Sequence, residues 1–224
     1  MNAYYSKKLS SNNLKRCYDI APLRVQQYLK SEMGYVLENI SCSDYTLELG
    51  CGYGRVLEKI LPFTSEVIGI DIAQESLKLA SEYIGNNQRC HLILANAKKL
   101  PFPDKSIDKV VCIQNGISAF KIDPQELVQE TLRVTKEGGV CMFSSYSPKF
   151  WKHRLDWFQK QADAGLIGKI DWSETKDGVI SCKDGFKATT FTLEDFTELI
   201  EQLELEATIV EVDASSVFCK IVVK

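Results

Sequence analysis

Three glycines at alternate positions are the strongest chemical signal in this chain of 224 residues. Gly50, Gly52 and Gly54 follow the apolar run 45–49 and precede a helical pattern near 55–62. Because glycine has no Cβ, such a loop can turn tightly and let a ligand lie against its backbone. The spacing predicts a ligand-binding turn between a strand and a helix.

A second signal is Asp71, which ends the next strand-like run, 23 residues after Glu48 (71 − 48). A carboxylate at the end of a second strand can accept hydrogen bonds from both hydroxyls of a ribose. A dinucleotide fingerprint would place a third glycine at position 55, where this chain has Arg55, and no Gly-Lys-Ser/Thr phosphate loop occurs. The two signals predict a nucleoside site and disfavour a pyrophosphate. The alternative is that Asp71 only caps the following helix.

The cysteines and histidines predict no metal centre. The eight cysteines are scattered without a C-x-x-C pair, and the chain has only two histidines. Cys112 and Cys141 lie within apolar runs, which is typical of buried thiols, so we expect all eight cysteines to be reduced. His91 begins a strand-like run, and for His153 a catalytic role competes with a solvated helix position.

Alternating strand-like and helical segments predict the scaffold that positions these residues. The strand-like runs are 45–49, 66–71, 91–95, 109–114 and 140–146, and the helical patterns lie near 55–62, 74–85 and 124–135. Short apolar strands separated by helices are typical of parallel strands joined by crossovers. The closing runs 206–212 and 216–223 are joined by three residues, so they should pair antiparallel. The fold class is α/β, a doubly wound, mostly parallel sheet of seven strands whose last strand is antiparallel.

We expect one domain over residues 1–224, with appendages around a core. The predicted parts are an N-terminal helical cap at 1–40, a core at 45–146, a lid or substrate insertion at 147–191, and a closing helix with two strands at 192–224. Pro22 precedes the first turn of a helix over 23–40, and Thr192 is the expected N-cap of the closing helix.

Composition excludes several partners. The chain is 45% hydrophobic and 25% charged with a net charge of −3, so it can bury one core but has no overall positive field for nucleic acid or anionic membranes. No apolar run approaches the ~20 residues that cross a bilayer, and the first residues lack the apolar segment of a signal peptide. We expect a soluble, cytoplasmic protein; its oligomeric state stays open.

Four motifs in register resemble those of class I S-adenosylmethionine-dependent methyltransferases, with the small-molecule enzymes of types 11 and 25 as the nearest branch. Residues 48–54 are similar to the first family motif and residues 69–72 to the second. Residues 94–108, with Leu-Pro-Phe at 100–102, and residues 130–139 resemble two further motifs. The resemblance covers 45–146 and implies a Rossmann-like fold, S-adenosylmethionine as cofactor and S-adenosylhomocysteine as product.

The same resemblance implies a set of cofactor contacts at the ends of the strands. The methionine end of the cofactor would lie against Glu48, Gly50, Cys51, Gly52, Gly54, Gln114 and Asn115, with Glu48 near its amino group. Asp71 would hold the ribose, and Ile72 would pack on the adenine. Asn96 replaces the usual aspartate, but its amide oxygen can still accept from the adenine amine, beside the Ala97 N–H. A plain turn residue is the alternative for Asn96.

The substrate pocket is predicted where the appendages meet the sheet edge. Methyl transfer from a sulfonium needs orientation and exclusion of water, and a general base only when the nucleophile must lose a proton. The candidate pocket residues are Asn115, Tyr146, Tyr18 and His153, among the appendage aromatics Tyr4, Tyr5, Trp151, Trp157, Phe158 and Trp172. The alternative is that Trp151, Leu155, Phe158 and Ala162 form the core stripe of one helix.

Three classes of function remain open. A small-molecule methyltransferase is favoured; the others are an RNA or protein methyltransferase and a nucleoside-binding protein without this activity, including a dehydrogenase. The basic stretch Lys149, Lys152, His153 and Arg154 could meet an anionic substrate or RNA, or be a solvated helix face. An Asn-Pro-Pro-Tyr tetrad is missing at 114–117, which weakens the nucleic-acid class. The acceptor and its accepting atom cannot be read from these residues.

Overall fold

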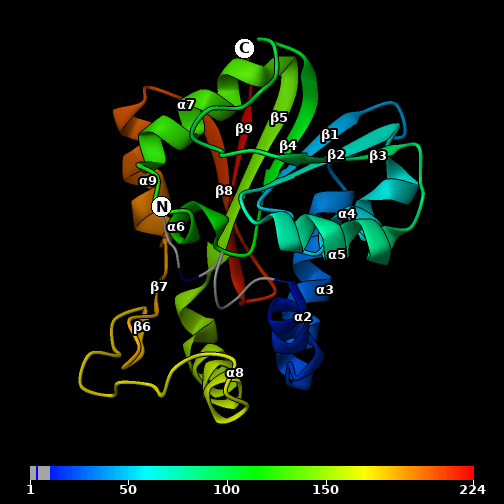
Figure 1. The fold of residues 1–224 in the computed structure, drawn as a ribbon. Helices are drawn as coiled ribbons and strands as arrows, with labels where there is room; N and C mark the ends of the chain where they lie inside the picture. Colours follow the sequence, from blue (N-terminus) through cyan, green and yellow to red (C-terminus); the bar gives the residue numbers. More distant parts are fainter. Residues whose placement is uncertain (1–3, 5–10) are drawn as a thin grey trace.

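The computed structural model describes Tyr4 and residues 11–224, and a seven-stranded sheet forms its centre (Figure 1). The strands are β1 (Tyr45–Leu49), β2 (Glu66–Asp71), β3 (Cys90–Leu94), β4 (Ile107–Cys112), β5 (Thr135–Tyr146), β8 (Ala207–Val212) and β9 (Ser216–Val222). Their order is β3-β2-β1-β4-β5-β9-β8, and β9 pairs antiparallel with both of its neighbours. The predicted mixed sheet is confirmed, with six strands parallel and one antiparallel.

Both faces of the sheet are covered by helices, as the apolar strands require. Val110 and Cys112 of β4 belong to one hydrophobic cluster, whereas Val111 between them belongs to another, because successive side chains point to opposite faces. The first cluster also contains buried residues of α7 (Pro124–Val134) and α9 (Leu193–Gln202); the second contains buried residues of α3 (Leu23–Leu37), α4 (Arg55–Ile60) and α5 (Gln74–Ile84). Burial on both faces is typical of parallel strands.

The ends of the elements follow local chemistry. The closing helix begins at a capping box, in which Thr192 and Asp195 each accept the backbone N–H of the other, so the predicted N-cap is confirmed. The run predicted as a strand to residue 114 ends at Cys112 instead. Gln114 and Asn115 adopt left-handed backbone angles, with φ of 54° and 64°, which a strand cannot contain.

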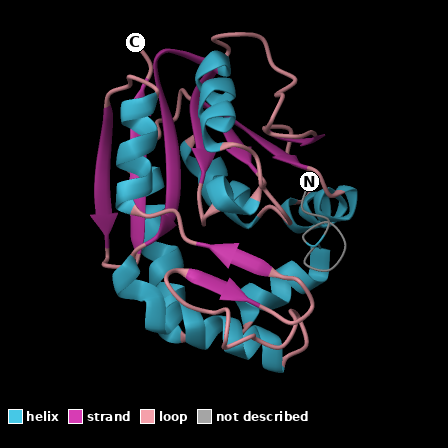
Figure 2. Cartoon of the chain, turned by 90° about the vertical axis from the view of Figure 1, so that its left-hand side faces the viewer, coloured by secondary structure: helices cyan, strands magenta, loops and turns pink. Residues whose placement is uncertain are grey.

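The two appendages pack on each other beyond the carboxyl end of β5. We call the cap α2 (Ser11–Asp19), α8 (Trp151–Asp163) and the hairpin of β6 (Val179–Ser181) and β7 (Lys187–Thr189). Buried side chains of the cap, among them Trp157 and Phe186, form a third hydrophobic cluster together with Tyr28 of α3, Tyr146 of β5 and Phe150. Figure 2 shows the hairpin apart from the main sheet and next to helices of the cap. The N-terminal helices and the insertion therefore share one packed core, separate from the two clusters on the faces of the sheet.

Short helical turns complete the chain. They are η1 (Leu61–Phe63), α6 (Gly116–Ala119) and η2 (Pro148–Phe150). Within the part of the chain that the structure describes, none of the helices combines the length and the apolar character needed to cross a membrane.

Arg154 departs most clearly from the sequence-based expectation. The sequence pattern places it on a basic face, yet its side chain is 1% exposed. Its guanidinium donates to the carbonyls of Gly178 and Ala188, at 2.9 and 3.0 Å, and lies 4.3 Å from the centroid of the Tyr146 ring. The buried stripe of α8 consists of Arg154, Trp157, Phe158 and Gln161, while Trp151, Leu155 and Ala162 are only partly buried. The predicted apolar stripe is therefore displaced, because carbonyl groups of the hairpin satisfy a buried guanidinium.

Replacing this arginine should detach the hairpin from α8. We expect Arg154→Met to lower the free energy of unfolding by about 3 kcal/mol, because buried carbonyl acceptors would lose their donors. Urea unfolding followed by circular dichroism measures the loss. Lys152→Met, at an exposed position of the same helix, is the control and should change stability by less than ~0.5 kcal/mol. Equal stability of the two variants would show that Arg154 does not hold the hairpin.

Candidate functional site

A cavity of about 550 Å³ lies at the carboxyl ends of the strands, between the sheet and the cap. Ligands of open α/β sheets bind at this edge. Among the residues predicted for the site, the cavity is lined by Tyr18, Glu48, Gly50, Cys51, Gly52, Asp71, Ile72, Asn96, Ala97, Gln114 and Tyr146. Gly54, Asn115 and His153 are not part of its wall.

The glycine loop is shaped by its backbone and by close neighbours. Gly50 and Gly52 have φ of 72° and 54°, which L side chains rarely adopt. A Cβ on Gly50 would lie 2.6 Å from the ring of Phe120, and one on Gly52 would lie 2.8 Å from the side chain of Leu14. Gly54 makes its close approach to Ile84 of α5, outside the cavity. The loop is thus packed between α2 and the segment after α6.

Asp71 ties the end of β2 to this loop. Its carboxylate accepts the N–H of Gly52 at 2.9 Å and the N–H of Ala73 at 2.8 Å. Burial raises the pKa of Asp71, and these backbone donors act against that rise. The capping position of α5 is Ala73 and not Asp71. Asp71 is therefore not the cap of this helix, and its carboxylate is held in a fixed orientation on the cavity wall.

One acidic and one basic side chain flank the glycine loop, and each has an unsatisfied atom. Glu48 is 5% exposed, and burial raises its pKa to about 8, with the positive charge of Arg55 opposing the rise. In the described part of the chain, Glu48 Oε2 and Arg55 Nη2 have no hydrogen-bond partner. The guanidinium of Arg55 lies 4.6 Å from the centroid of the Tyr18 ring. From the sequence, Arg55 counted only as evidence against a dinucleotide-binding site. Its position directly after the third glycine was the signal that could have placed it in the site.

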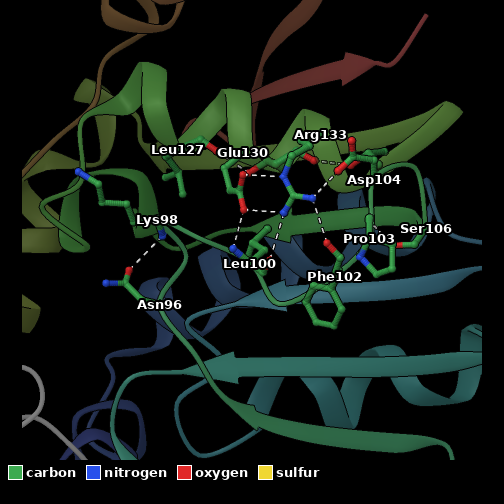
Figure 3. Close-up of polar contacts among 12 residues, drawn as sticks. Asn96, Lys98, Leu100, Phe102, Pro103, Asp104, Ser106, Leu127, Glu130 and Arg133 are labelled. Atoms are coloured by element: carbon green, nitrogen blue, oxygen red, sulfur yellow. Dashed lines mark hydrogen bonds and ion pairs between the residues drawn. The ribbon is translucent and has the colours of Figure 1, made fainter.

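The two later sequence motifs form one structural unit, shown in Figure 3. The guanidinium of Arg133 donates to the carbonyls of Leu100 and Phe102 and to the carboxylates of Asp104 and Glu130. Glu130 in turn accepts the N–H of Leu100 at 2.6 Å. A partly buried ion pair on α7 therefore holds the loop that follows β3 in place.

This clamp positions the short turn that begins at Asn96. Asn96, Ala97 and Lys98 line the cavity, and the Asn96 amide oxygen accepts the N–H of Lys98 at 3.0 Å (Figure 3). The turn expected as the alternative for Asn96 is thus present. An amide oxygen has a second lone pair and Asn96 keeps its NH₂ group, so the side chain can still contact a ligand. Adenine recognition by Asn96 stays a prediction.

Gln114 and Asn115 point in different directions from the end of β4. Gln114 lines the cavity, and its amide oxygen accepts the Tyr18 hydroxyl at 2.6 Å. Asn115 instead donates to the carbonyl of Thr189 at 2.9 Å and accepts the Ser145 hydroxyl at 2.7 Å. Both ends of the Asn115 amide are thus engaged in fastening β7 to the sheet, away from the cavity wall, and its contact with cofactor or substrate stays a prediction.

Of the other residues predicted for the site, some line the cavity and others lie on the protein surface. Tyr146 lines the cavity, whereas His153 is exposed, with its ring centroid 5.7 Å from that of Phe150, so the structure does not favour a catalytic histidine. Trp172 is exposed, and Tyr5 lies outside the described residues. The eight cysteines are free, and the described residues contain no group of side chains suited to a metal ion.

Several wall residues and one buried carboxylate were not predicted from the sequence. Gln161 of α8 and Phe120 after α6 line the cavity. Glu32 of α3 is buried and accepts the N–H of Gln114 at 3.2 Å and the hydroxyl of Ser144. Nothing in the spacing of these residues signalled a shared site, because each belongs to a different element.

Comparisons with known proteins agree with the fold and the loop. A family model described as a methyltransferase domain matches residues 47–143. MJ1123, an uncharacterized protein of Methanocaldococcus jannaschii, is 33% identical over 168 residues, which are 71% of this chain and 74% of that protein. A malonyl-[acyl-carrier protein] O-methyltransferase of Marinomonas is 33% identical over 109 residues, but the match spans 47% of this chain and 39% of that enzyme.

A solved structure extends the similarity to nearly the whole chain. The N-methyltransferase NodS of Bradyrhizobium japonicum, in complex with S-adenosylhomocysteine, has a TM-score of 0.59 and is 16% identical, with 99% of this chain and 98% of that chain covered. At this identity the likeness concerns the fold. Together with the family match, the chain belongs to the class I S-adenosylmethionine-dependent methyltransferases, and its cofactor is S-adenosylmethionine.

The buried Glu48 carboxyl should make stability depend on pH. The folded protein holds this proton up to pH about 8, whereas the unfolded chain releases it near the ordinary value of 4.5, so stability falls as pH rises between these values. We expect Glu48→Gln, without cofactor, to be more stable than the wild type by ~1–3 kcal/mol at pH 8.5, since each pKa unit corresponds to about 1.4 kcal/mol.

The measurement is the difference in free energy of unfolding between variant and wild type at pH 5 and pH 8.5. Glu75→Gln, at an exposed carboxylate of α5, is the control and should show no such pH dependence. A Glu48→Gln variant whose advantage is the same at both pH values would show that the carboxyl does not stay protonated in the folded protein.

Proposed function

We propose that this protein transfers a methyl group from S-adenosylmethionine to a small-molecule acceptor enclosed between the sheet and the cap. The observation that carries the proposal is one continuous cavity. It begins at the glycine loop, where Glu48 and Arg55 each keep an unsatisfied atom, and ends among the aromatic side chains of α8 and the hairpin. A concave site lined by aromatic rings and a few polar groups is typical of small-molecule binding.

The residues at the glycine loop match the cofactor's amino-acid end. A buried carboxyl and a buried guanidinium on either side of one loop are complementary to a zwitterion, so Glu48 would bind the ammonium and Arg55 the carboxylate. Asp71, already held by two backbone donors, would accept the ribose hydroxyls. Ile72 is partly exposed on the cavity wall beside Asn96 and Ala97, where the adenine would lie.

The reaction demands little acid–base chemistry from this chain. Bound in the cavity, the cofactor supplies a methyl group on a positively charged sulfur. Burial raises the pKa of Tyr18 and of Cys17 to about 12, so both stay protonated at neutral pH and serve as hydrogen-bond donors. The acceptor must therefore bring its own lone pair, while the cap orients it and excludes water.

An RNA or protein acceptor is the less favoured alternative. The aromatic end of the cavity lies under α8 and the hairpin, where Trp157, Phe158 and Phe186 are buried. The basic stretch considered for RNA has lost Arg154 to the interior, and Lys149 pairs with Glu211. These features support an acceptor small enough to be enclosed.

Calorimetry with four ligands tests the cofactor assignment. S-adenosylmethionine and S-adenosylhomocysteine should bind, and NAD should not, because the loop offers no pyrophosphate site. Arg55→Gln should weaken S-adenosylhomocysteine by ~1.5–3 kcal/mol, since a charged hydrogen bond is lost. It should leave 5′-methylthioadenosine, which lacks the amino-acid end, nearly unaffected.

Asp71→Asn should not discriminate between S-adenosylhomocysteine and 5′-methylthioadenosine, unlike Arg55→Gln. This variant should weaken both adenosine compounds alike, because the ribose is common to them. Tight NAD binding with no heat from either sulfur compound would refute the assignment. Equal losses for both compounds in Arg55→Gln would place the cofactor's carboxylate elsewhere.

The N-terminal helix should respond to the cofactor. Leu14, Cys17 and Tyr18 of α2 line the cavity and lie over the glycine loop, so a bound cofactor would be covered by this helix. Backbone amides of α2 should exchange more slowly with S-adenosylhomocysteine than without it. Amides of β9, which does not line the cavity, are the internal control. Unchanged exchange in α2 would mean that the helix does not close over the ligand.

A further inference from the structure

The cap end of the cavity has an aromatic wall built from three parts of the chain. The rings of Tyr18, Trp157, Phe158 and Phe186 follow one another, with centroids 5.8, 5.8 and 5.9 Å apart. All four residues line the cavity. Such a wall favours an apolar body of the size of one or two rings.

The ionisable side chains of the aromatic wall itself carry no charge at neutral pH. The cations Arg154 and Lys121 are near: Arg154 is bonded to hairpin carbonyls and does not line the cavity, whereas Lys121 lines it after α6. Tyr18 and Cys17 are protonated, and the Trp157 N–H is already used by the carbonyl of Cys17 at 2.8 Å. A charged group that entered this part of the cavity would lose its hydration without a counter-charge from these side chains. Arg55, the cation 4.6 Å from the centroid of the Tyr18 ring, comes directly after the glycine loop.

Two amides at the same end have unused hydrogen-bonding capacity. Gln161 is 4% exposed and lines the cavity, and its side-chain amide makes no hydrogen bond to any described residue. Gln114 Nε2 is likewise buried without a partner among the described residues, although the oxygen of the same amide accepts from Tyr18. A buried amide nitrogen such as Gln114 Nε2 is costly to leave unsatisfied, and the Gln161 amide on the same cavity wall has its hydrogen bonds unused, so the two together indicate a ligand.

We propose that Gln161, with Gln114, recognises the methyl acceptor, and that this acceptor is an uncharged small molecule with an apolar, ring-sized body and one neutral hydrogen-bonding group. The inference rests on the function proposed above. Gln161 offers both a donor and an acceptor, so a hydroxyl, an uncharged amine or an amide would use both, whereas a carboxylate would use only the donor and would lack a counter-charge on the aromatic wall. Gln161 is thus a specificity-determining residue and takes no part in the chemical step.

The test uses the protein saturated with S-adenosylhomocysteine at pH 7 and three naphthalene probes. 2-Naphthol has a neutral donor and acceptor, naphthalene has neither, and 2-naphthoate carries a charge. Calorimetry should show 2-naphthol binding at least about tenfold more tightly than the other two, the discrimination that one well-placed hydrogen bond provides. Gln161→Leu should reduce 2-naphthol binding about tenfold and leave naphthalene within twofold.

The matched control is Gln159→Leu, the same substitution on the same helix. The Gln159 amide bonds to Asp163 at 2.7 Å, and the residue lies outside the cavity, so its loss should change no probe. All variants should bind S-adenosylhomocysteine like the wild type, which shows that they are folded and keeps this test separate from the proposed function. Failure to bind S-adenosylhomocysteine overturns the function itself.

Three results would overturn the inference while leaving the function intact. They are equal or tighter binding of 2-naphthoate, an unchanged preference for 2-naphthol in Gln161→Leu, and no measurable binding of 2-naphthol to the saturated protein. Tight binding of 2-naphthoate that Arg55→Gln abolishes would assign the acceptor end to an anionic substrate held by Arg55.

Discussion

The left-handed turn at the end of β4 is the constraint that holds the site together. Gln114 and Asn115 take up φ values that non-glycine residues avoid, and both are kept there by bonds from other elements. Glu32 of α3 and Ser144 of β5 accept the N–H of Gln114, and Tyr18 of α2 donates to its amide. Asn115 reaches the hairpin. Gln114 and Asn115 therefore connect the sheet to the N-terminal helices and to the insertion. The shape of the cavity wall depends on these contacts.

Several of the groups proposed for binding are among those that the folded protein leaves unsatisfied. The Gln161 amide makes no hydrogen bond to any described residue. Glu48 and Arg55 each have a buried atom without a hydrogen-bond partner among the described residues. Folding without ligand carries the desolvation cost of these atoms, and binding would recover it. The unsatisfied polar groups therefore lower the stability of the ligand-free protein and make the site more selective for its ligand. Such a trade-off between stability and function is common.

Sequence patterns correctly predicted the features that are determined by residues close together in the chain. Alternating apolar residues predicted the sheet, and the glycine loop with Asp71 predicted the edge where the cavity lies. Patterns failed where a polar side chain is satisfied by a distant element. Sequence alone places Arg154 at the surface because the hairpin carbonyls that accept its hydrogen bonds lie more than 20 residues further on. It places Asn115 in the cavity because a position in a motif does not reveal the direction of an amide.

The features shared with the family and the features particular to this chain lie in different parts of the structure. The family match covers residues 47–143, which contain the glycine loop, Asp71 and the clamp around Arg133. The aromatic wall and Gln161 come almost entirely from α2, α8 and the hairpin, outside that range. Because these cap elements pack around their own hydrophobic cluster, their cavity-facing side chains can change without disturbing the sheet. The shared core accounts for the cofactor, and the acceptor has to be inferred from the cap of this particular chain.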